Sequence, residues 1–220
     1  MYLASLSMPA GSEWLAVVLA YLLGSVPFGY LFGRMRGVDL RKVGSGNIGA
    51  TNTGRAIGKP LGYLAFLLDF GKGLVPATWF AVWFGSGAPE VPPGSLAVWC
   101  GMAAVCGHVW PIYLRFQGGK AVATGAGVIV AFEPLIFVLG GAVWLITLFS
   151  LGFVSLASIA MAVSFPVIAW QVQSESGFGS EVIAFCLAFA LLVVYRHKSN
   201  LARLAKGLEP HWRDKLKKKS

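Results

Sequence analysis

Charged residues are scarce in this 220-residue chain: Asp, Glu, Lys and Arg make up 12% of it, whereas hydrophobic residues make up 56%. A water-soluble domain of this length needs more polar surface than that. Cysteine is scarce as well, and its three copies show no Cys-x-x-Cys spacing, which argues against a thiolate metal centre or a dithiol redox motif. We interpret Cys100, Cys106 and Cys186 as small packing residues inside apolar segments.

Long apolar runs are what the sequence has instead. A helix needs about 20 mostly apolar residues to cross a bilayer core of about 30 Å. The runs are continuous rather than alternating, which disfavours membrane-spanning strands. Seven candidate spans cover residues 14–32, 61–84, 96–114, 121–132, 135–149, 153–170 and 182–195. The predicted fold class is therefore all-α, a polytopic membrane protein with seven transmembrane helices in a single domain over residues 1–220.

Some of these spans leave alternatives open. The runs at 121–132 and 135–149 are short, and form either two thin spans or one broken hairpin. The second span contains Asp69 and Lys72. It is either a full span from about Leu61 or an interfacial segment followed by a span from Gly73. No basic residue precedes the first apolar run, so we do not expect a cleaved signal peptide.

The basic residues predict an orientation. All 18 Lys and Arg residues except Lys72 fall on one side of the predicted spans, in the first and second loops of that side and in the C-terminal tail. The positive-inside rule makes this the cytoplasmic side, with the N-terminus outside and the C-terminus inside. The net charge of +9 then reflects topology, and we expect no nucleic-acid binding. We interpret the tail KLKKK as an anchor against anionic lipid.

The polar residues gather in four regions on this cytoplasmic side, at residues 33–60, 115–120, 150–158 and 196–220. The first contains GSGNIGATNTGR, residues 44–55. Its small residues are Gly44, Ser45, Gly46, Gly49 and Ala50, and its polar side chains are Asn47, Thr51, Asn52 and Arg55. Small residues let backbone N–H groups converge on an oxyanion, as in phosphate nests and at helix N-termini. We expect Gly49 to need a positive φ, so that a valine at this position abolishes activity.

The second region repeats this design in GGKAVATG, where Gly118, Gly119 and Lys120 precede an apolar helix. A helix N-terminus favours a bound anion. Neither motif indicates a nucleotide fold, because no strand precedes GSGNIG and Lys120 is followed by Ala121 rather than Ser or Thr.

Several polar residues have a structural interpretation beside the functional one. His108 is either a site residue or a structural histidine at the membrane interface. Asp69 and Lys72 are either functional or a self-neutralising pair three residues apart. The hydroxyls of Ser155 and Ser158 bind a substrate or bond back to helix carbonyls. The helix glycines Gly24, Gly29 and Gly33 are interpreted as close-packing positions.

Taken together, SGNIGATN with its following Arg, LLDFGKG, GHVWPIYLRFQGGKAVATG, FVSLAS and YRHKSNLARLAKGLE resemble the bacterial acyl-phosphate:glycerol-3-phosphate acyltransferase family, commonly called PlsY. The resemblance covers nearly the whole chain, with the motifs in order. It implies a seven-helix inner-membrane enzyme that transfers an acyl chain from acyl phosphate to the 1-position of glycerol 3-phosphate, giving lysophosphatidic acid. Two departures stand out: Ala121 replaces a usual glycine, and an Arg usual before the SL-x-S motif is missing, with Gly152 and Phe153 in that region.

The resemblance also implies site residues. The contacts expected for acyl phosphate are Ser45, Asn47, Gly49, Thr51 and Asn52. The contacts expected for glycerol 3-phosphate are Arg55, Lys120, Ser155, Ser158, His197 and Asn200. From their place in the two glycine-rich loops, Gly46, Ala50, Gly118 and Gly119 are added as binding residues, and Lys120, Arg55 and His197 are taken as catalytic.

The expected reaction is direct attack of a glycerol hydroxyl on the acyl carbon, because acyl phosphate is already activated and needs no covalent enzyme intermediate. None of the three histidines has an Asp five residues later, so the HxxxxD signature of soluble-type acyltransferases is absent. The proton acceptor is either the donor phosphate or His197. We expect no cofactor and no metal site, since the histidines and acids are scattered. The expected partners are the two substrates and the lipid bilayer, with the enzyme that makes acyl phosphate as a further candidate.

Two other classes remain open. A transporter for a small phosphorylated solute also fits seven spans and an anion loop, but transporters place polar groups near the bilayer midplane on related repeats, and no repeat is apparent here. The other alternative is a non-catalytic membrane scaffold, but that function would not explain the four polar regions.

Overall fold

The computed structural model describes residues 8–85, 94–176 and 179–214, and within these ranges the chain is helical and contains no strand. The predicted all-α class is therefore confirmed. The helices gather into two compact units, one from Ala4 to Phe132 and one from Glu133 onward, which are described separately here. The basic tail residues Lys215, Lys217, Lys218 and Lys219 lie outside the described residues, as does the outer-loop Glu90. The expectation of one domain over the whole chain stays a prediction.

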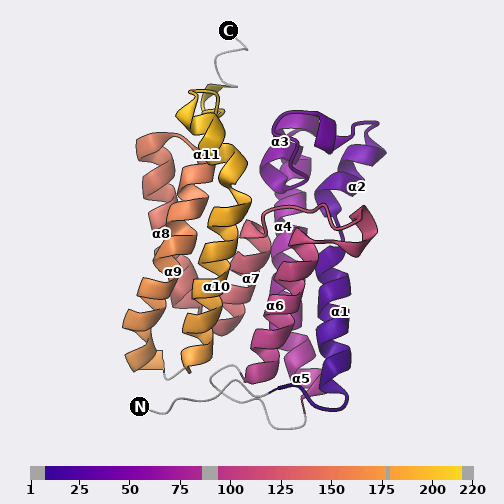
Figure 1. Cartoon of the computed structure of the whole chain (residues 1–220), viewed down its shortest axis with the longest axis vertical. Coiled ribbons are helices and arrows are strands. Elements are labelled where there is room, and N and C mark those ends of the chain that lie inside the picture. Colours follow the sequence, from indigo (N-terminus) through magenta and orange to yellow (C-terminus); the bar gives the residue numbers. More distant parts are fainter. Residues whose placement is uncertain (1–7, 86–93, 177–178, 215–220) are drawn as a thin grey trace. The chain divides into compact units, whose positions relative to one another are not determined.

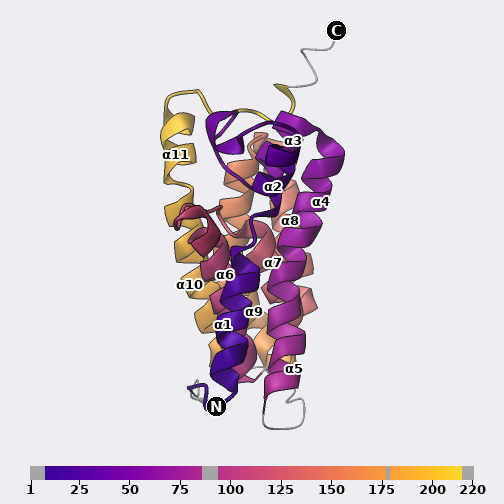
Figure 2. The ribbon, with the colours of Figure 1, turned by 90° about the vertical axis from the view of Figure 1, so that its right-hand side faces the viewer.

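The first unit is built from long apolar helices and short ones that follow the breaks between them. Its elements are α1 (Glu13–Ser25), α2 (Phe28–Met35), η1 (Leu40–Lys42), α3 (Ala50–Ile57), α4 (Lys59–Val75), η2 (Pro76–Phe80), α5 (Ala81–Phe84), α6 (Ser95–Val109), η3 (Ile112–Leu114) and α7 (Val122–Phe132). Helix α1 packs on α6, and α4 packs on α7. Figures 1 and 2 both show α2 and α3 at one end of this unit and α5 at the other.

Close helix contact in the first unit depends on glycine. A Cβ atom on Gly24 in α1 would collide with the backbone carbonyl of Ala104 in α6, and one on Gly107 would collide with the carbonyl of Tyr21. The two backbones therefore approach directly, which confirms the packing interpretation of Gly24. A Gly24→Ala change, which would be mild if the glycine only touched neighbouring side chains, instead meets backbone that cannot move aside.

The second unit consists of α8 (Pro134–Leu151), α9 (Val154–Ser176), α10 (Ser180–Arg196) and α11 (Lys198–Ala205). Helix α9 packs on both α8 and α10. Helix α11 follows α10 after a bend of 49° at His197, as Figure 1 shows. The polar residues Ser155, His197 and Asn200 lie at the start of α9 and around this bend.

Five helical segments of the described residues are long and apolar enough to cross a membrane: Glu13–Met35, Lys59–Phe84, Ser95–Leu114, Pro134–Leu151 and Val154–Val172. The bent pair Ser180–Arg196 and Lys198–Ala205 makes a sixth if it is one span. Helix α7 has 11 residues and at 1.5 Å per residue is only about 16 Å long. A multi-pass membrane protein is thus confirmed, while the seventh span stays a prediction.

The second predicted span lies in one continuous helical segment, while the residue at which it enters the membrane stays a prediction. Helix α4 begins at Lys59 and continues through η2 and α5 to Phe84, so Asp69 and Lys72 lie inside one 26-residue helical segment. The turn at Pro76–Phe80 is a π-helix, which relieves the clash that Pro76 causes with the preceding turn.

Candidate active site

The first glycine-rich loop is organised around the side chain of Asn52, which is 2% exposed. Its Oδ1 accepts a hydrogen bond from the Ser45 N–H at 3.0 Å. Its Nδ2 donates to the carbonyls of Leu40, Val43 and Asn47 at 3.1, 3.1 and 2.8 Å. The side-chain amide of Asn52 thus holds the loop closed through these hydrogen bonds. Asn52 is engaged inside the loop rather than directed outward, and its place indicates a loop-forming residue.

The left-handed positions of this loop are Gly44 and Gly46, with φ of 58° and 71°. A Cβ on Gly44 would also collide with Oδ1 of Asn52. Gly49 has φ −79° and ψ 169°, an extended conformation open to any residue. The expectation that Gly49 needs a positive φ is therefore wrong. The sequence pattern shows that a glycine-rich loop turns sharply but not at which glycine it does so.

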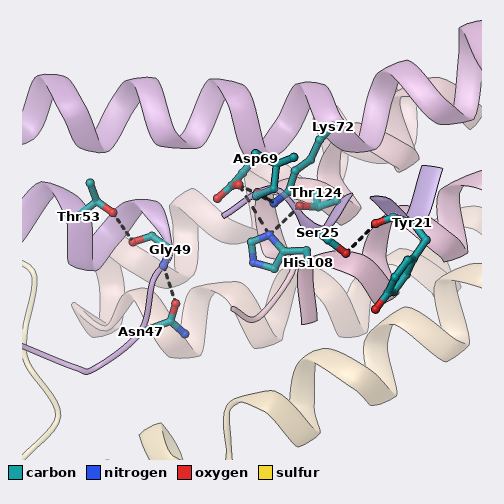
Figure 3. Close-up of polar contacts among 10 residues, drawn as sticks. Tyr21, Ser25, Asn47, Gly49, Thr53, Asp69, Lys72, His108 and Thr124 are labelled. Atoms are coloured by element: carbon teal, nitrogen blue, oxygen red, sulfur yellow. Dashed lines mark hydrogen bonds and ion pairs between the residues drawn. The ribbon is translucent and has the colours of Figure 1, made fainter. Parts of the chain in front are cut away.

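Helix α3 begins directly after this loop and points its first N–H groups back toward it. Gly49 is the N-cap, and its own N–H donates to Oδ1 of Asn47 at 2.7 Å (Figure 3). Gly49 O accepts from the N–H groups of both Asn52 and Thr53. The N–H groups of Ala50 and Thr51 lie in the first turn of α3. No carbonyl within the helix can accept them there, as at every helix N-terminus. These two donors, with the dipole of α3, form the anion-favouring feature of the loop.

The second glycine-rich loop closes on the end of α6. The N–H groups of Gly118 and Gly119 donate to the carbonyls of Val109 and His108 at 3.1 and 3.0 Å. Two carbonyls left without partners at the helix C-terminus are thereby satisfied. These N–H groups are used within the fold, so the predicted nest of donors at Gly118 and Gly119 is wrong in this conformation. The glycines serve close approach, since a Cβ on Gly118 would collide with His108 O.

Ala121, next to Lys120, has φ 59° and is fully buried. The resemblance implies a glycine at this position, and the left-handed conformation is one that glycine adopts without strain. A left-handed non-glycine residue costs about 1–2 kcal/mol. The chain holds this conformation between the half-buried Lys120 and the start of α7.

We expect Ala121→Gly to stabilise the protein slightly. It removes the left-handed penalty of about 1–2 kcal/mol and adds about 0.5–1 kcal/mol of backbone entropy loss on folding. The net gain is up to about 1.5 kcal/mol in the free energy of unfolding, measured as a raised thermal unfolding midpoint in detergent. A lowered midpoint would show that the alanine methyl contributes more by packing than its backbone conformation costs.

A buried polar cluster lies beside this second loop. Lys72 Nζ lies 2.9 Å from Asp69 Oδ1 and donates to the carbonyl of Val26 at 2.8 Å. His108 Nδ1 lies 3.2 Å from Thr124 Oγ1 and 3.7 Å from Asp69 Oδ1. Figure 3 shows these side chains converging from α4, α6 and α7. Asp69 and Lys72 do pair three residues apart, but they also join His108 and the break between α1 and α2.

Breaking this ion pair is expected to cost more than removing it. Asp69→Asn leaves the Lys72 ammonium buried without its counter-charge, a loss of about 3–5 kcal/mol. Asp69→Asn combined with Lys72→Met removes both charges and is expected to melt higher than Asp69→Asn alone. Thermal unfolding of the purified variants in one detergent checks the order. The reverse order would mean that the Lys72 ammonium without its counter-charge does not destabilise the protein.

The second unit has its own polar cluster, which centres on Glu209. Its carboxylate accepts from Asn200 Nδ2 at 2.7 Å and from Arg203 Nε at 2.9 Å, and Ser155 bonds to it as well. Burial alone would raise the pKa of Glu209, but the hydrogen bonds from Asn200, Ser155 and Arg203 outweigh it and hold this pKa below its ordinary value. The carboxylate is therefore charged at neutral pH and ties α9, α11 and the C-terminal segment together.

Two further predicted site residues of this unit, Ser158 and His197, differ in what their polar atoms contact. Ser158 Oγ donates to the Val154 carbonyl at 2.8 Å and lies 3.4 Å from Trp144 Nε1, so the back-bonding interpretation holds for Ser158. His197 is 3% exposed, and its Nδ1 lies 2.8 Å from the Val193 carbonyl. A carbonyl only accepts, so Nδ1 carries the proton, and Nε2 is the nitrogen that can take up a proton when the ring is neutral.

The C-terminal segment covers the turn at which the family's usual Arg is missing. Trp212 N–H donates to the Gly152 carbonyl at 2.9 Å. The rings of His211 and Trp212 pack edge-on against Phe153 and Phe149. Aromatic contacts thus fix the turn before α9 in this chain.

Sequence reasoning missed Glu209 and Thr124 as cluster members. Glu209 was visible only as the end of a motif, and its approach to Asn200 depends on the chain reversal after α11, at Gly207 with φ 67°. Thr124 lies in the first turn of α7, and the sequence pattern did not single it out. Neither contact follows from helical spacing.

Comparison with known proteins decides the family. The model of the glycerol-3-phosphate acyltransferase family matches residues 14–207. This chain belongs to that family. A glycerol-3-phosphate acyltransferase of Aquifex aeolicus is 40% identical over 193 residues, which cover 88% of this chain and 95% of the relative. Glycerol-3-phosphate acyltransferase 2 of Bacillus cereus is 41% identical over 200 residues, covering 90% of this chain and 94% of the relative.

Solved structures agree with this assignment. The crystal structure of PlsY, an integral membrane glycerol 3-phosphate acyltransferase, in its glycerol 3-phosphate form has a TM-score of 0.82 and 40% identity, covering 91% of this chain and 96% of that one. Its lysophosphatidic acid form gives 0.79 and 38%, covering 91% and 95%. The protein is therefore an acyltransferase of phospholipid biosynthesis, and the transporter and scaffold alternatives are excluded.

Proposed function

We propose that this acyltransferase uses acyl phosphate as donor and acylates the 1-position hydroxyl of glycerol 3-phosphate, giving lysophosphatidic acid and inorganic phosphate. The observation that carries the proposal is the first loop, in which Asn52 holds small residues around the N-terminus of α3. This arrangement suits a phosphate group. The glycerol 3-phosphate and lysophosphatidic acid forms of PlsY, 40% and 38% identical to this chain, support the same acceptor and product.

The substrate contacts are proposed as follows. The N–H groups of Ala50 and Thr51, with the polar groups of Ser45 and Asn47, bind the donor phosphate, while Gly46 and Gly49 keep the approach clear. Arg55 and Lys120 add positive charge for the phosphate that leaves, and Arg can bind it through two parallel hydrogen bonds. Asn52, Gly118 and Gly119 shape the loops rather than touch substrate. In the second unit, Ser155, His197 and Asn200 provide the polar groups for glycerol 3-phosphate, and Ser158 supports them.

The chemistry is a single acyl transfer. The acceptor hydroxyl oxygen forms a bond to the acyl carbon, and the bond from that carbon to the phosphate oxygen breaks. The hydroxyl proton passes either to the departing phosphate or to Nε2 of His197, the basic nitrogen of the neutral ring. Preorganised positive charge at Lys120 and Arg55 stabilises the transition state as negative charge develops on the phosphate.

Donor choice tests the proposal. We expect purified protein to form lysophosphatidic acid from palmitoyl phosphate and glycerol 3-phosphate without coenzyme A or acyl carrier protein. Palmitoyl-coenzyme A in place of palmitoyl phosphate is expected to give no product. Turnover with the thioester alone would leave the family assignment intact and overturn the proposed donor.

We further propose seven spans in the bacterial inner membrane, with the N-terminus outside and the active site facing the cytoplasm. Ser12→Cys and Ser199→Cys are both at exposed positions at opposite ends of the helical chain. In intact cells, a membrane-impermeant thiol reagent is expected to label Ser12→Cys, whereas Ser199→Cys reacts only after the cells are opened. The native cysteines Cys100 and Cys186 are buried, and the half-buried Cys106 is replaced by alanine in both variants to remove its background labelling. Labelling in the opposite order would reverse the orientation.

A further inference from the structure

The cluster of Asp69, Lys72, His108 and Thr124 is buried, polar and not required for the chemistry described above. Its four side chains are each 6% exposed or less. Buried ionisable groups in membrane segments are costly to insert, so their presence calls for a physical role. The question is what this cluster does for the protein.

We propose that His108, held by Thr124 and Asp69, is a positioning residue that sets the place of the Gly118–Lys120 loop, and so of Lys120, for acyl transfer. This inference rests on the proposed role of Lys120 at the substrate phosphate. It assigns to the cluster a task beyond neutralising its own charges.

His108 holds the loop in two ways. Its backbone carbonyl accepts the Gly119 N–H at 3.0 Å. Its ring lies directly against Gly119, so that a Cβ atom there would collide with Nε2 and come within 3.0 Å of Cδ2 and Cε1. The loop therefore rests against the Nε2 edge of the imidazole. Any rotation of this ring displaces Gly119 and, with it, the next residue, Lys120.

The ring is itself fixed from the other side. Nδ1 faces Thr124 Oγ1 at 3.2 Å and Asp69 Oδ1 at 3.7 Å. Thr124 stands in the first turn of α7, only four residues after Lys120, so the two ends of the loop are tied to one ring. A hydrogen-bonded imidazole has one preferred orientation, whereas an apolar side chain of the same size would be held by packing alone.

Lys72 extends this support to the break between α1 and α2. Its ammonium donates to the Val26 carbonyl at 2.8 Å, directly before Pro27 interrupts the helix. Nearby, the Tyr21 hydroxyl donates to the Trp110 carbonyl at 2.8 Å, at the start of the same loop region. The cluster thus fixes α1, α4, α6 and α7 at the level where the loop leaves α6.

A complementation experiment follows from the contact between the ring and Gly119. Gly119→Ala adds a methyl group where Nε2 lies, and His108→Asn keeps a polar atom near Nδ1 but removes the far edge of the ring. We expect each single variant to lose about 10-fold in kcat/KM, and the double variant to return to within about 3-fold of wild type, a coupling within the range seen for residues in contact. Additive losses in the double variant, or full activity of Gly119→Ala, would overturn the proposal.

A second pair of variants covers the case in which Gly119→Ala fails to fold. Thr124→Val removes the hydroxyl facing Nδ1 at nearly constant shape, and Thr124→Ser keeps it. We expect Thr124→Val to lose about 10-fold in kcat/KM in the folded fraction, with Thr124→Ser close to wild type, as for other contacting residues. Thr78→Val is the matched control, because its hydroxyl bonds only to helix carbonyls of Leu74 and Val75, away from the loop. Equal kinetics of Thr124→Val and Thr78→Val would contradict the positioning role.

Hydrogen–deuterium exchange separates this inference from the proposed function. The Gly118 and Gly119 amides donate to carbonyls in the wild type and are expected to exchange slowly. Exchange of these two amides is expected to be faster in Gly119→Ala and in Thr124→Val, and slow again in the Gly119→Ala/His108→Asn double variant. This readout needs no turnover. Unchanged exchange in both single variants would overturn the inference, whereas a wild-type protein inactive with acyl phosphate would overturn only the donor assignment.

Discussion

Lys120→Ala and Arg55→Ala are each expected to reduce kcat/KM by about 10²-fold or more, the scale for losing a preorganised charge contact in a transition state. Arg55 lies in the short helix α3, and Lys120 lies in the loop before α7. The thermal unfolding midpoint is therefore expected to stay close to that of wild type. Steady-state kinetics with acyl phosphate and glycerol 3-phosphate measures the effect.

Charge controls are available in the same loops. Arg115 is exposed in the loop that carries Lys120, and Lys59 is exposed directly after the helix that carries Arg55. Arg115→Ala and Lys59→Ala are expected to leave the kinetics nearly unchanged. If they were as damaging as Lys120→Ala and Arg55→Ala, the loss would reflect the overall positive potential rather than two specific contacts.

Gly49→Val is the second change for which we expect a large loss, again about 10²-fold or more, and for a reason that the structure has altered. Gly49 is extended, so valine fits its backbone conformation. The nearest atom to an added Cβ is Asn47 Oδ1 at 3.0 Å. The variant should fold and melt normally. A branched side chain would then stand at the N-terminus of α3 and block the approach of a phosphate.

Gly44→Val is its matched counterpart. Gly44 is left-handed, and a side chain there would meet Oδ1 of Asn52, the acceptor of the Ser45 N–H. We expect this variant to lose both loop structure and stability. If Gly49→Val kept normal turnover, the phosphate would not bind at α3. If Gly49→Val unfolded, the loop would be a structural hinge.

Most of the fold could be predicted from the sequence because a membrane-spanning helix requires a run of about 20 mostly apolar residues. The seven apolar runs sufficed to place the helices, and they correspond to α1 with α2, α4 to α5, and α6 to α10. The length of α7 departs from the requirement. Its residues are apolar, but with 11 residues the helix is shorter than the other candidate spans.

The polar regions were predictable in composition but less so in geometry. That residues 44–49 form a small-residue loop followed a visible pattern, while the position of each positive φ depends on which carbonyls Asn52 reaches. The GGK sequence suggested free N–H donors, yet the end of α6 required those donors for its own carbonyls. Contacts such as His108 with Gly119, or Glu209 with Asn200, join residues through a chain reversal and have no sequence period.

The reaction itself provides the most direct test of the account. Acyl phosphate labelled at phosphorus is incubated with glycerol 3-phosphate and the purified protein, and both products are quantified. We predict one labelled inorganic phosphate for each lysophosphatidic acid, with no label in the lipid, because the acyl carbon is attacked and phosphate leaves. Label in the lipid, or phosphate released without acylated glycerol 3-phosphate, would contradict it.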